Sequence, residues 1–548
     1  MQLTHYGGKY SIERMLALEE YTRQTTIARL VLVSVGVPFL ILLLVFCQEN
    51  VPLQDPADGW EANYGFWVRV GCLGAVVGFA GARQFGSWLD VTDLSGRQTI
   101  VFCCLKAFGF VAAGMATAEI WVFPIPFFIL SLSLVWPLIL VGSLRIAVGA
   151  RAFQQICSRQ EQLQRLNKLG ALQSLLCAAY PAYQVLFKHA SHTSYELPML
   201  LFLPLFKILM RIIFWLAASH KEDMIPEQVV FTVDFFDAFY LATFMPQMST
   251  STVITVLAIH FAQTALELQE LYRRTQNILM RLHETAGLLS TDLNNDFLTA
   301  LRSLCYYSTH MNAFQKSGIR VYSSISHQLS PEGKKLLDTF HCQGKPSRII
   351  LQPSANFIHV PSKSVNGGLR TGSTVRPLTA VTILPKCPSQ SGGARGLTRT
   401  RTKRRDSLND ASKILQEALE VLFASECLVL IEYVEIIIPA LYAVYVLAMV
   451  HVPSAQYHSE MSGMTRENAG SMVSRMLIFA LMELISLFVL ALIMKRNCGI
   501  RALYQLGFVL ETQMLSVMSK LLLWIVFTLT YRVSHFGADF SFQFEWIK

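Results

Sequence analysis

Long apolar runs alternate with short polar segments along most of this chain. Each run is close to the ~20 residues that an α-helix needs to cross the hydrocarbon of a bilayer. The clear runs are 28–47, 65–82, 100–118, 123–144, 169–187, 197–217, 428–452, 473–494 and 505–531. Helices satisfy their own backbone hydrogen bonds in lipid. The pattern therefore predicts an all-α, polytopic membrane protein.

One further apolar region, 231–266, is interrupted by Asp234, Asp237 and Pro246. As one crossing, it gives 10 membrane helices. As two short helices, 231–245 and 250–266, it forms a hairpin or re-entrant pair and gives about 11. We favour the pair, because a single crossing would place the basic loop around 495–501 outside the cytosol.

The positive charge is concentrated in one long polar region. Residues 268–428 contain 21 Lys and Arg against 11 Asp and Glu, whereas the whole chain has a net charge of only +9. The N-terminal region contains Lys9, Arg14, Arg23 and Arg29, whereas the loop 48–64 has no Lys or Arg. Positive residues favour the cytosolic side. We therefore expect the N-terminus and the 268–428 insert to be cytosolic and the C-terminus to be non-cytosolic.

This pattern predicts five regions in chain order. They are a cytosolic N-terminal segment 1–27, a first membrane block 28–266, a basic cytosolic insert 267–427, a second membrane block 428–531 and a C-terminal tail 532–548. Within the insert, 345–407 is rich in Pro, Gly, Ser, Thr and basic residues and lacks periodicity, which is typical of disorder.

Charged residues inside the predicted spans are the strongest candidates for function. Glu432 and Glu435 share a helix face, Glu483 is mid-span, and Glu511 and Lys520 lie in the last span on opposite faces. A charge at the bilayer centre costs about 2.5–3.5 kcal/mol on insertion scales. The cluster favours a polar interior or a water-filled cavity. The alternative is that Glu432 lies near the cytosolic interface and the others are protonated or paired within the packing.

No metal, cofactor or catalytic site is predicted. Carboxylate di-metal bundles use Glu-x-x-His pairs, and neither Glu432 nor Glu435 has such a His. The 11 Cys are scattered, and no phosphate-binding loop, GxSxG or HExxH motif occurs. Lys106 and His260 are lone polar residues to which the sequence assigns no role.

A stripe of small residues marks the second predicted span. Gly74, Gly78 and Ala82 recur every four residues and so share one face of the helix. Such stripes let two membrane helices approach closely. We expect helix packing there, with a pore lining as the weaker alternative.

The basic run 395–405 and the following Ser407 suggest regulation. Six of its residues are Lys or Arg, which favours contact with anionic lipids. The order Arg404, Arg405, Asp406, Ser407 resembles a basophilic kinase site, where phosphate would add up to about −2 charges. The alternative is a solvated linker. Nucleic-acid binding is not expected, because interleaved aromatic residues and a reader fold are absent from the sequence.

Several stretches resemble an oomycete family of polytopic membrane proteins of unknown molecular function. They are YGGKYSIERMLALEEYTR at 6–23, VPLQDPADGWEANYGFWVR at 51–69, DFFDAFY at 234–240, YVEIIIPALYAVYV at 433–446, LGFVLETQ at 506–513 and HFGADFSFQFEW at 535–546. The resemblance covers both membrane blocks and leaves the insert largely free. It implies membrane localisation and supplies no substrate.

Three functional hypotheses follow from the residues. A transporter or channel-like protein is favoured by the acidic residues at membrane depth. A membrane receptor or signalling scaffold would use the insert as a phosphorylatable docking segment. A membrane-embedded transferase is least favoured, since only Asp234, Asp237 and the glutamates could serve it.

Overall fold

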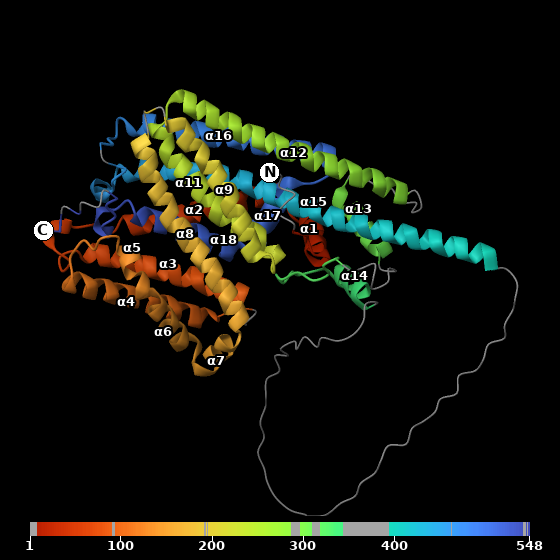
Figure 1. Ribbon diagram of the computed structural model, residues 1–548, viewed down its shortest axis with the longest axis horizontal. Helices are drawn as coiled ribbons and strands as arrows, with labels where there is room; N and C mark the ends of the chain where they lie inside the picture. Colours follow the sequence, from red (N-terminus) through yellow and green to blue (C-terminus); the bar gives the residue numbers. More distant parts are fainter. Residues whose placement is uncertain are drawn as a thin grey trace, which may run out of the picture.

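The computed structural model describes residues 8–89, 94–190, 193, 195–286, 296–308, 318–342, 394–461, 463–540, 544 and 546–547. These residues form helices and connecting turns, with no strand among them (Figure 1). The all-α prediction is thus confirmed for this part of the chain. Most helices lie roughly along the long axis of the molecule (Figure 1).

Seven of the described helices are long and apolar enough to cross a membrane, or up to nine if each of two bent helix pairs is one span. The seven are α2 (Ile27–Glu49), α3 (Tyr64–Trp88), α4 (Gly96–Ile120), α9 (Glu196–Ala218), α12 (Thr250–Ala286), α15 (Ala394–Met449) and α16 (Ala469–Ile493). The bent pairs are α5 (Phe128–Ser131) with α6 (Trp136–Val148), at 64°, and α17 (Ala502–Thr512) with α18 (Met514–Thr530), at 83°. The number of such helices is that of a multi-pass membrane protein.

Local sequence signals place several helix starts. Thr26 accepts a hydrogen bond from the Arg29 backbone amide at the start of α2, as an N-cap residue does. Ser95 and Gln98 form a reciprocal capping box at the start of α4. The apolar run of α2 then exposes Leu32 and Phe39 on its outer face.

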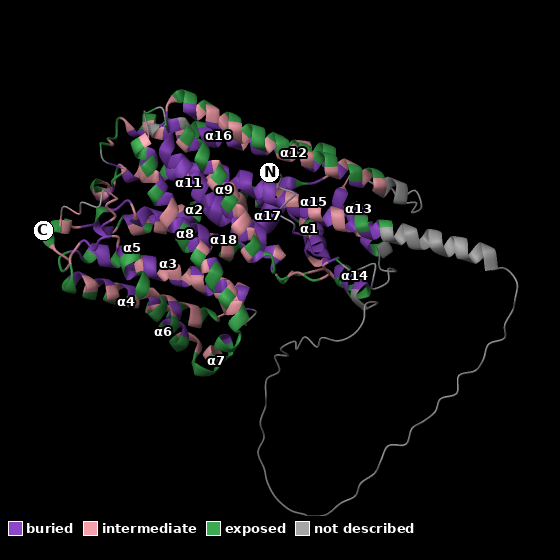
Figure 2. Ribbon diagram, viewed as in Figure 1, coloured by how far each residue is buried: buried purple, intermediate pink, exposed green. Residues whose placement is uncertain are grey.

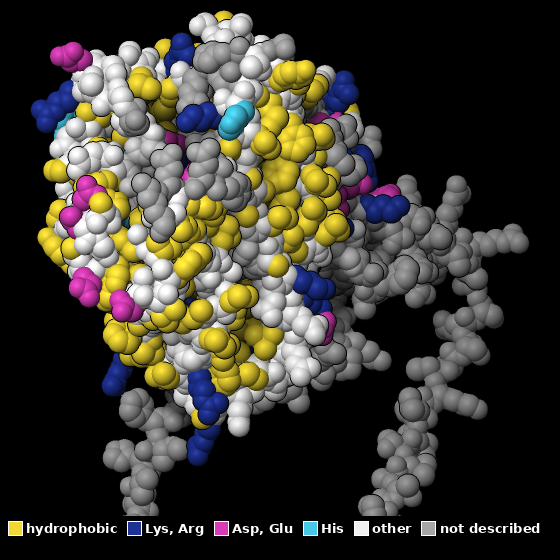
Figure 3. Space-filling model, turned by 60° about the vertical axis from the view of Figure 1, so that its left-hand side comes forward, with side chains coloured by type: hydrophobic (Ala, Val, Ile, Leu, Met, Phe, Trp, Pro, Cys, Tyr) yellow, Lys and Arg dark blue, Asp and Glu magenta, His cyan; other side chains and the backbone are white. Residues whose placement is uncertain are grey.

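Apolar side chains cover much of the outside of the molecule, as expected for a lipid-facing surface. Figure 3 shows broad hydrophobic areas on one face. By contrast, α15 is mainly buried, and Figure 2 shows it with α11 (Phe235–Phe244) in the interior. About 78% of the apolar window of α15 is buried, against 11% for α12, so α15 is the central helix and α12 lies at the surface.

The two ends of the bundle can be defined by their elements. The α1 end carries α1 (Ile12–Gln24), α13 (Phe297–Ser308) and α14 (Pro331–Cys342), and the C-terminal end carries the last residues of the chain (Figure 1). At the α1 end, Arg14 donates a 2.7 Å hydrogen bond to the carbonyl oxygen of Asp223. At the C-terminal end, Arg475 at the start of α16 donates to the carbonyl oxygen of Met248.

The region 231–266 is divided between two helical segments, and both differ in length from the prediction. The first is a continuous buried run of α10 (Ile225–Val229), a π-helix (Val230–Asp234) and α11. It leads from Asp223 at the α1 end to Met248 at the C-terminal end. The second, α12, begins at Thr250 as predicted but continues to Ala286 instead of ending near Leu266. α8 (Gln160–Ala190) contains the predicted span 169–187 but is not among the seven apolar helices.

Part of the insert is folded against the membrane block. Both α13 and α14 pack on α1, and α13 also packs on α15. Residues 394–407 were predicted to be disordered, but their backbone is helical and forms the start of α15. The remainder of that predicted segment, up to residue 393, lies outside the described residues, as do the side chains of 395–405 and Ser407.

The small-residue stripe of α3 lies against α4. A Cβ added at Gly74 would lie only 2.9 Å from the Cα of Ala107, and one at Gly78 would lie 3.1 Å from the Cα of Cys103. Ala82 is buried on the same helix. Glycine is therefore required for the approach of these two backbones.

Lys106, to which the sequence assigned no role, lies on α4. Its ammonium is 3.2 Å from the ring centroid of Trp136, which is a cation–π contact.

Candidate functional site

Charged side chains from five helical segments meet inside the bundle. Lys207 is on α9, Asp237 on α11, His260 on α12, Glu435 on α15 and Glu483 on α16. All are buried or nearly so. We call these five residues, with Asp234, Arg211 and Glu432, the charged cluster.

The cluster lies several helical turns from the C-terminal end of the bundle. His260 is the tenth residue after Thr250, the first of α12, and Glu435 is the fourteenth before Met449, the last of α15. At 1.5 Å per residue, these positions are roughly 15–21 Å from the C-terminal end. Since the hydrocarbon of a bilayer is about 30 Å thick, this depth is near its middle.

Lys207 is the cationic centre of the cluster. Its Nζ lies 2.8 Å from Oδ2 of Asp237 and 2.8 Å from Oε1 of Glu435. Asp234 accepts a 2.9 Å hydrogen bond from Nε of Arg211. Asp234 is the last residue of the π-helix and Asp237 lies in the first turn of α11, and both carboxylates contact cations of α9. Asp234 and Asp237, the two acids of the predicted re-entrant region, thus contact the two cations of the cluster, Arg211 and Lys207.

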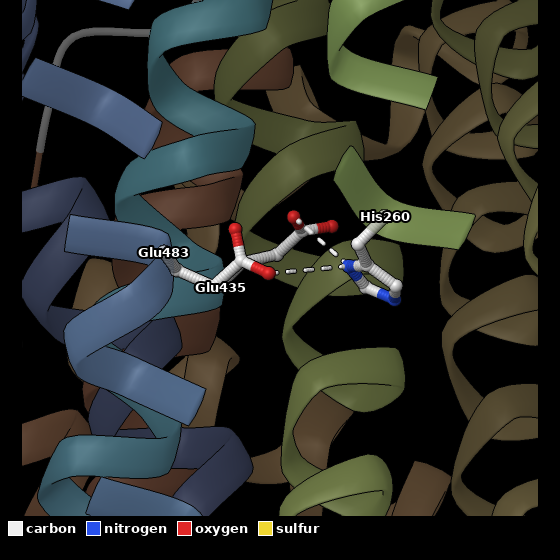
Figure 4. A group of neighbouring side chains, drawn as sticks. All are labelled: His260, Glu435 and Glu483. Carbon is white, nitrogen blue, oxygen red and sulfur yellow. Dashed lines mark ion pairs between the residues drawn. The ribbon is translucent and has the colours of Figure 1, made fainter. Parts of the chain in front are cut away.

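His260, Glu435 and Glu483 form the other side of the cluster (Figure 4). Nδ1 of His260 lies 3.5 Å from Oε2 of Glu435 and 3.8 Å from Oε1 of Glu483. One donor atom from each residue lies within 4.8 Å of the others. The two oxygens of Glu435 therefore face different partners, with Oε1 toward Lys207 and Oε2 toward His260.

Glu432 extends the cluster by one helical turn. Thr264 of α12 donates a 2.6 Å hydrogen bond to Oε1 of Glu432, while Oε2 is buried without a hydrogen-bond partner among the described residues. Since α12 and α15 are antiparallel, the pair Thr264 and Glu432 lies one turn from the pair His260 and Glu435. Glu432 is 1% exposed, so protein surrounds its side chain, and the alternative that it lies near the cytosolic interface stays a prediction.

A cavity of about 450 Å³ leads to the cluster from the α1 end. It follows the groove between α12 and α15, from His260 and Glu435 at its inner end to Arg274 and Glu420 at its outer end. The separation of these pairs along the helices corresponds to roughly 20 Å. Its lining also includes Lys207, Arg211 and Glu432, so the cluster borders a space large enough for water.

Carboxylates outnumber cations around the inner end of this cavity. Among the described residues there, the permanent cations are Lys207 and Arg211. The carboxyl groups are those of Asp234, Asp237, Glu267, Glu432, Glu435 and Glu483. Unpaired buried charge is costly, so this excess requires protons or a bound cation.

Two of the charged residues predicted for the pathway lie elsewhere. Glu511 pairs with Arg29 and accepts a 3.0 Å hydrogen bond from Tyr21. Burial, together with the Glu511 carboxylate, raises the pKa of Tyr21 to about 12. Lys520 pairs with Glu227 of α10. Glu511 and Lys520 thus have separate partners, and neither belongs to the charged cluster.

Sequence reasoning missed three members of the cluster. Lys207 and Arg211 are charged residues inside the predicted apolar span 197–217. They therefore give the same sequence signal as Glu435 does in its own span. His260 was noticed but given no role, because its partners lie on other helices.

No protein-family model matches this chain, and comparisons with curated proteins and with solved structures give no match. The resemblance to an oomycete membrane protein family therefore stays a prediction. The charged cluster and its cavity are the basis for assigning a function.

Proposed function

We propose that the protein is a membrane transporter whose path includes the α12–α15 cavity and the charged cluster. One observation carries this proposal: a cavity of about 450 Å³ lined by charged groups ends on a cluster with excess carboxylates near mid-depth. Transporters place their binding sites near the bilayer midplane, where irregular helix geometry lines a cavity. The excess of negative charge favours a cationic substrate or coupling ion, protons included.

The cavity reaches the cluster from the α1 end. Beyond the cluster, toward the C-terminal end, a small space of about 30 Å³ is lined mainly by apolar residues. They include Leu200, Leu203, Leu241 and Val256, all buried. This apolar layer separates the charged cluster from the C-terminal end. It is the barrier expected in a transporter open to one side.

The helices around the cluster contain two points at which a bend can form. Pro204 interrupts the backbone hydrogen bonding of α9 one turn before Lys207. The π-helix Val230–Asp234 precedes α11 and includes Asp234 itself. Such irregularities inside membrane helices frequently mark functional sites. They support movement of α9 and α11 against α12 and α15.

The bundle geometry also supports the predicted topology. If α8, the run 225–244 and each bent pair are counted as crossings beside the seven apolar helices, the described helices amount to eleven, the number that the sequence predicts. With the basic insert in the cytosol, the cavity opens to the cytosol. A protease site placed near Ser391 in oriented vesicles tests this orientation, since cleavage from the lumenal side would reverse it. The scaffold and transferase hypotheses have no comparable structural support.

The proposal is tested by flux through the full-length protein in liposomes. Under an imposed gradient, the protein should move protons, monovalent cations or divalent cations faster than empty liposomes do. Glu435→Gln should reduce this flux to background, because it removes the carboxylate that joins Lys207 to His260. Glu467→Gln, at an exposed position before α16, is the matched control. Background flux of all these ions through the wild-type protein would overturn the proposal.

A further inference from the structure

The triad of His260, Glu435 and Glu483 has the composition of a metal site. One imidazole nitrogen and two carboxylate oxygens come from three different helices, α12, α15 and α16. The sequence prediction of no metal rested on the lack of a His beside Glu435 on its own helix. The fold supplies that His from α12, so the reason for excluding a metal no longer holds.

The distances within the triad are close to those of a coordination sphere. Two ligands about 2.1 Å from a metal in tetrahedral geometry are about 3.4 Å apart. The observed separations from Nδ1 of His260 are 3.5 Å to Glu435 and 3.8 Å to Glu483. Both separations lie within about 0.4 Å of the tetrahedral value, and the third, between the carboxylates of Glu435 and Glu483, is less than 4.8 Å.

Lys207 acts from outside this triad. Its ammonium binds Oε1 of Glu435 at 2.8 Å and leaves Oε2 directed toward His260. A partner that holds the far oxygen of a ligating carboxylate orients the near oxygen for the metal. The positive charge of Lys207 is already matched by Asp237, at 2.8 Å.

Glu432 is the second, independent indication of a ligand. It lines the same cavity and is 1% exposed; Thr264 and Ser486 lie beside its carboxylate, but its Oε2 makes no well-formed hydrogen bond to a described residue. A buried, unpaired carboxylate oxygen is costly unless something binds it. It lies one helical turn from Glu435, where it can take a proton from an ion's water or become a further ligand.

We propose that the triad binds one divalent transition-metal ion and that this ion is the transported substrate. The role as substrate rests on the proposed transport function, whereas the binding site does not. Imidazole with carboxylates suits zinc, iron or nickel, while calcium and magnesium prefer oxygen ligands alone. Three protein ligands leave an open position for water from the cavity, which allows the ion to exchange.

Zinc binding to the purified, chelator-treated full-length protein tests the site directly. The wild type should bind about one Zn²⁺ per chain in calorimetry and give a visible absorption band with Co²⁺. Glu483→Gln should weaken Zn²⁺ binding by at least the 10- to 100-fold that loss of an outer-shell partner costs. Glu467→Gln and His451→Gln, both at exposed positions, should bind as the wild type does.

A change of metal preference separates ligation from a merely structural role. His260→Cys replaces the imidazole with a softer thiolate, which should raise the affinity for Cd²⁺ relative to Zn²⁺. This ratio does not depend on the fraction of protein that folds. An unchanged Cd²⁺ to Zn²⁺ ratio, with Zn²⁺ still bound, would overturn the assignment of His260.

Binding and flux together distinguish the two proposals. If liposomes show cation flux but the protein binds no Zn²⁺, the metal site is overturned and transport stands. If Zn²⁺ binds at the triad but no ion crosses the membrane, transport and the substrate role are overturned and the site stands. Zn²⁺ uptake that Glu483→Gln abolishes supports both.

Discussion

The ammonium of Lys207 on α9 lies 2.8 Å from a carboxylate oxygen of Glu435 on α15, which is 228 residues later in the chain. Both side chains are buried, with exposed fractions of 8% and 7%. This pair joins two helices that lie on either side of the long insert. It also connects the Asp234 and Asp237 side of the charged cluster to the His260 side.

Removal of the cation at this position should destabilise the protein strongly. Lys207→Met leaves the carboxylates of Asp237 and Glu435 buried without their common partner, and loss of one member of a buried pair costs about 3–5 kcal/mol. The measurement is the free energy of unfolding in mixed micelles. Lys188→Met, at an exposed position on α8, should change it by less than about 0.5 kcal/mol. Equal stability of the two variants would contradict the ion-pair network.

Close packing of α3 on α4 predicts sensitivity at Gly74. Gly74→Val places atoms against the backbone of Ala107 and should destabilise the protein by about 1–3 kcal/mol, as overpacking does. Gly36→Val on α2 is the control, because an added Cβ there meets no atom within 4 Å. Thermal unfolding in detergent compares the two. A larger loss for Gly36→Val would show that these helices pack differently.

The free energy of unfolding should fall as the pH drops from about 6.5 toward 4, because His535 becomes protonated more readily in the unfolded chain. Burial lowers the pKa of His535 to about 4. Its Nε2 lies 2.7 Å from the carbonyl oxygen of Gln54 and 3.1 Å from Oδ1 of Asn63. The unfolded chain, with a His pKa near 6.5, binds the proton more readily in this range. The neutral His535 therefore contributes roughly 3 kcal/mol to the free energy of unfolding. This contribution is present above pH 6.5 and is lost toward pH 4.

His535→Gln should flatten this part of the stability profile. The check is the melting temperature at pH 7.5, 6.5, 5.5 and 4.5 for the variant and the wild type. Burial also lowers the pKa of His327 to about 4, so a smaller slope should persist. His451→Gln, at an exposed position, should leave the profile unchanged. An identical slope in His535→Gln would contradict the prediction.

Docking of the insert depends on Asp223. This buried carboxylate accepts hydrogen bonds from the Ser324 amide at 2.9 Å and the Ser323 hydroxyl at 3.0 Å, and it pairs with Arg320. Asp223→Ala should loosen residues 318–342 and raise their tryptic cleavage rate about tenfold, since each such bond contributes about 0.5–3 kcal/mol. Asp338→Ala, at an exposed position of α14, is the control. Equal cleavage rates would show that Asp223 does not hold the segment.

Much of the architecture could be predicted from hydropathy. The runs at 28–47 and 65–82 lie within α2 and α3, and the run 473–494 extends one residue beyond α16. Apolar length is a local property that lipid selects directly. The prediction was poorer at 225–244, where Glu227, Asp234 and Asp237 lower the apolar signal. The prediction was also poorer for residues 394–407, because their polar composition gives no sign that their backbone is helical and continues into the rest of α15.

The charged cluster could be predicted only in part. Glu435 and Glu483 stand out in the sequence because a carboxylate inside an apolar run is rare. Their partner His260 does not, since a single His on the surface helix α12 gives no signal of its own. Glu511 looked equivalent to Glu435 but pairs with Arg29 at the α1 end.

The sequence by itself predicted a helical membrane protein with several charges inside its membrane helices. Only the tertiary structure decided which of those charges meet: Lys207 with Glu435, His260 with Glu483, and Lys520 with Glu227. The physical reason is that insertion into lipid depends on the apolar content of each segment alone. Pairing depends on the rotation and register of whole helices, which are set by packing across residues hundreds of positions apart.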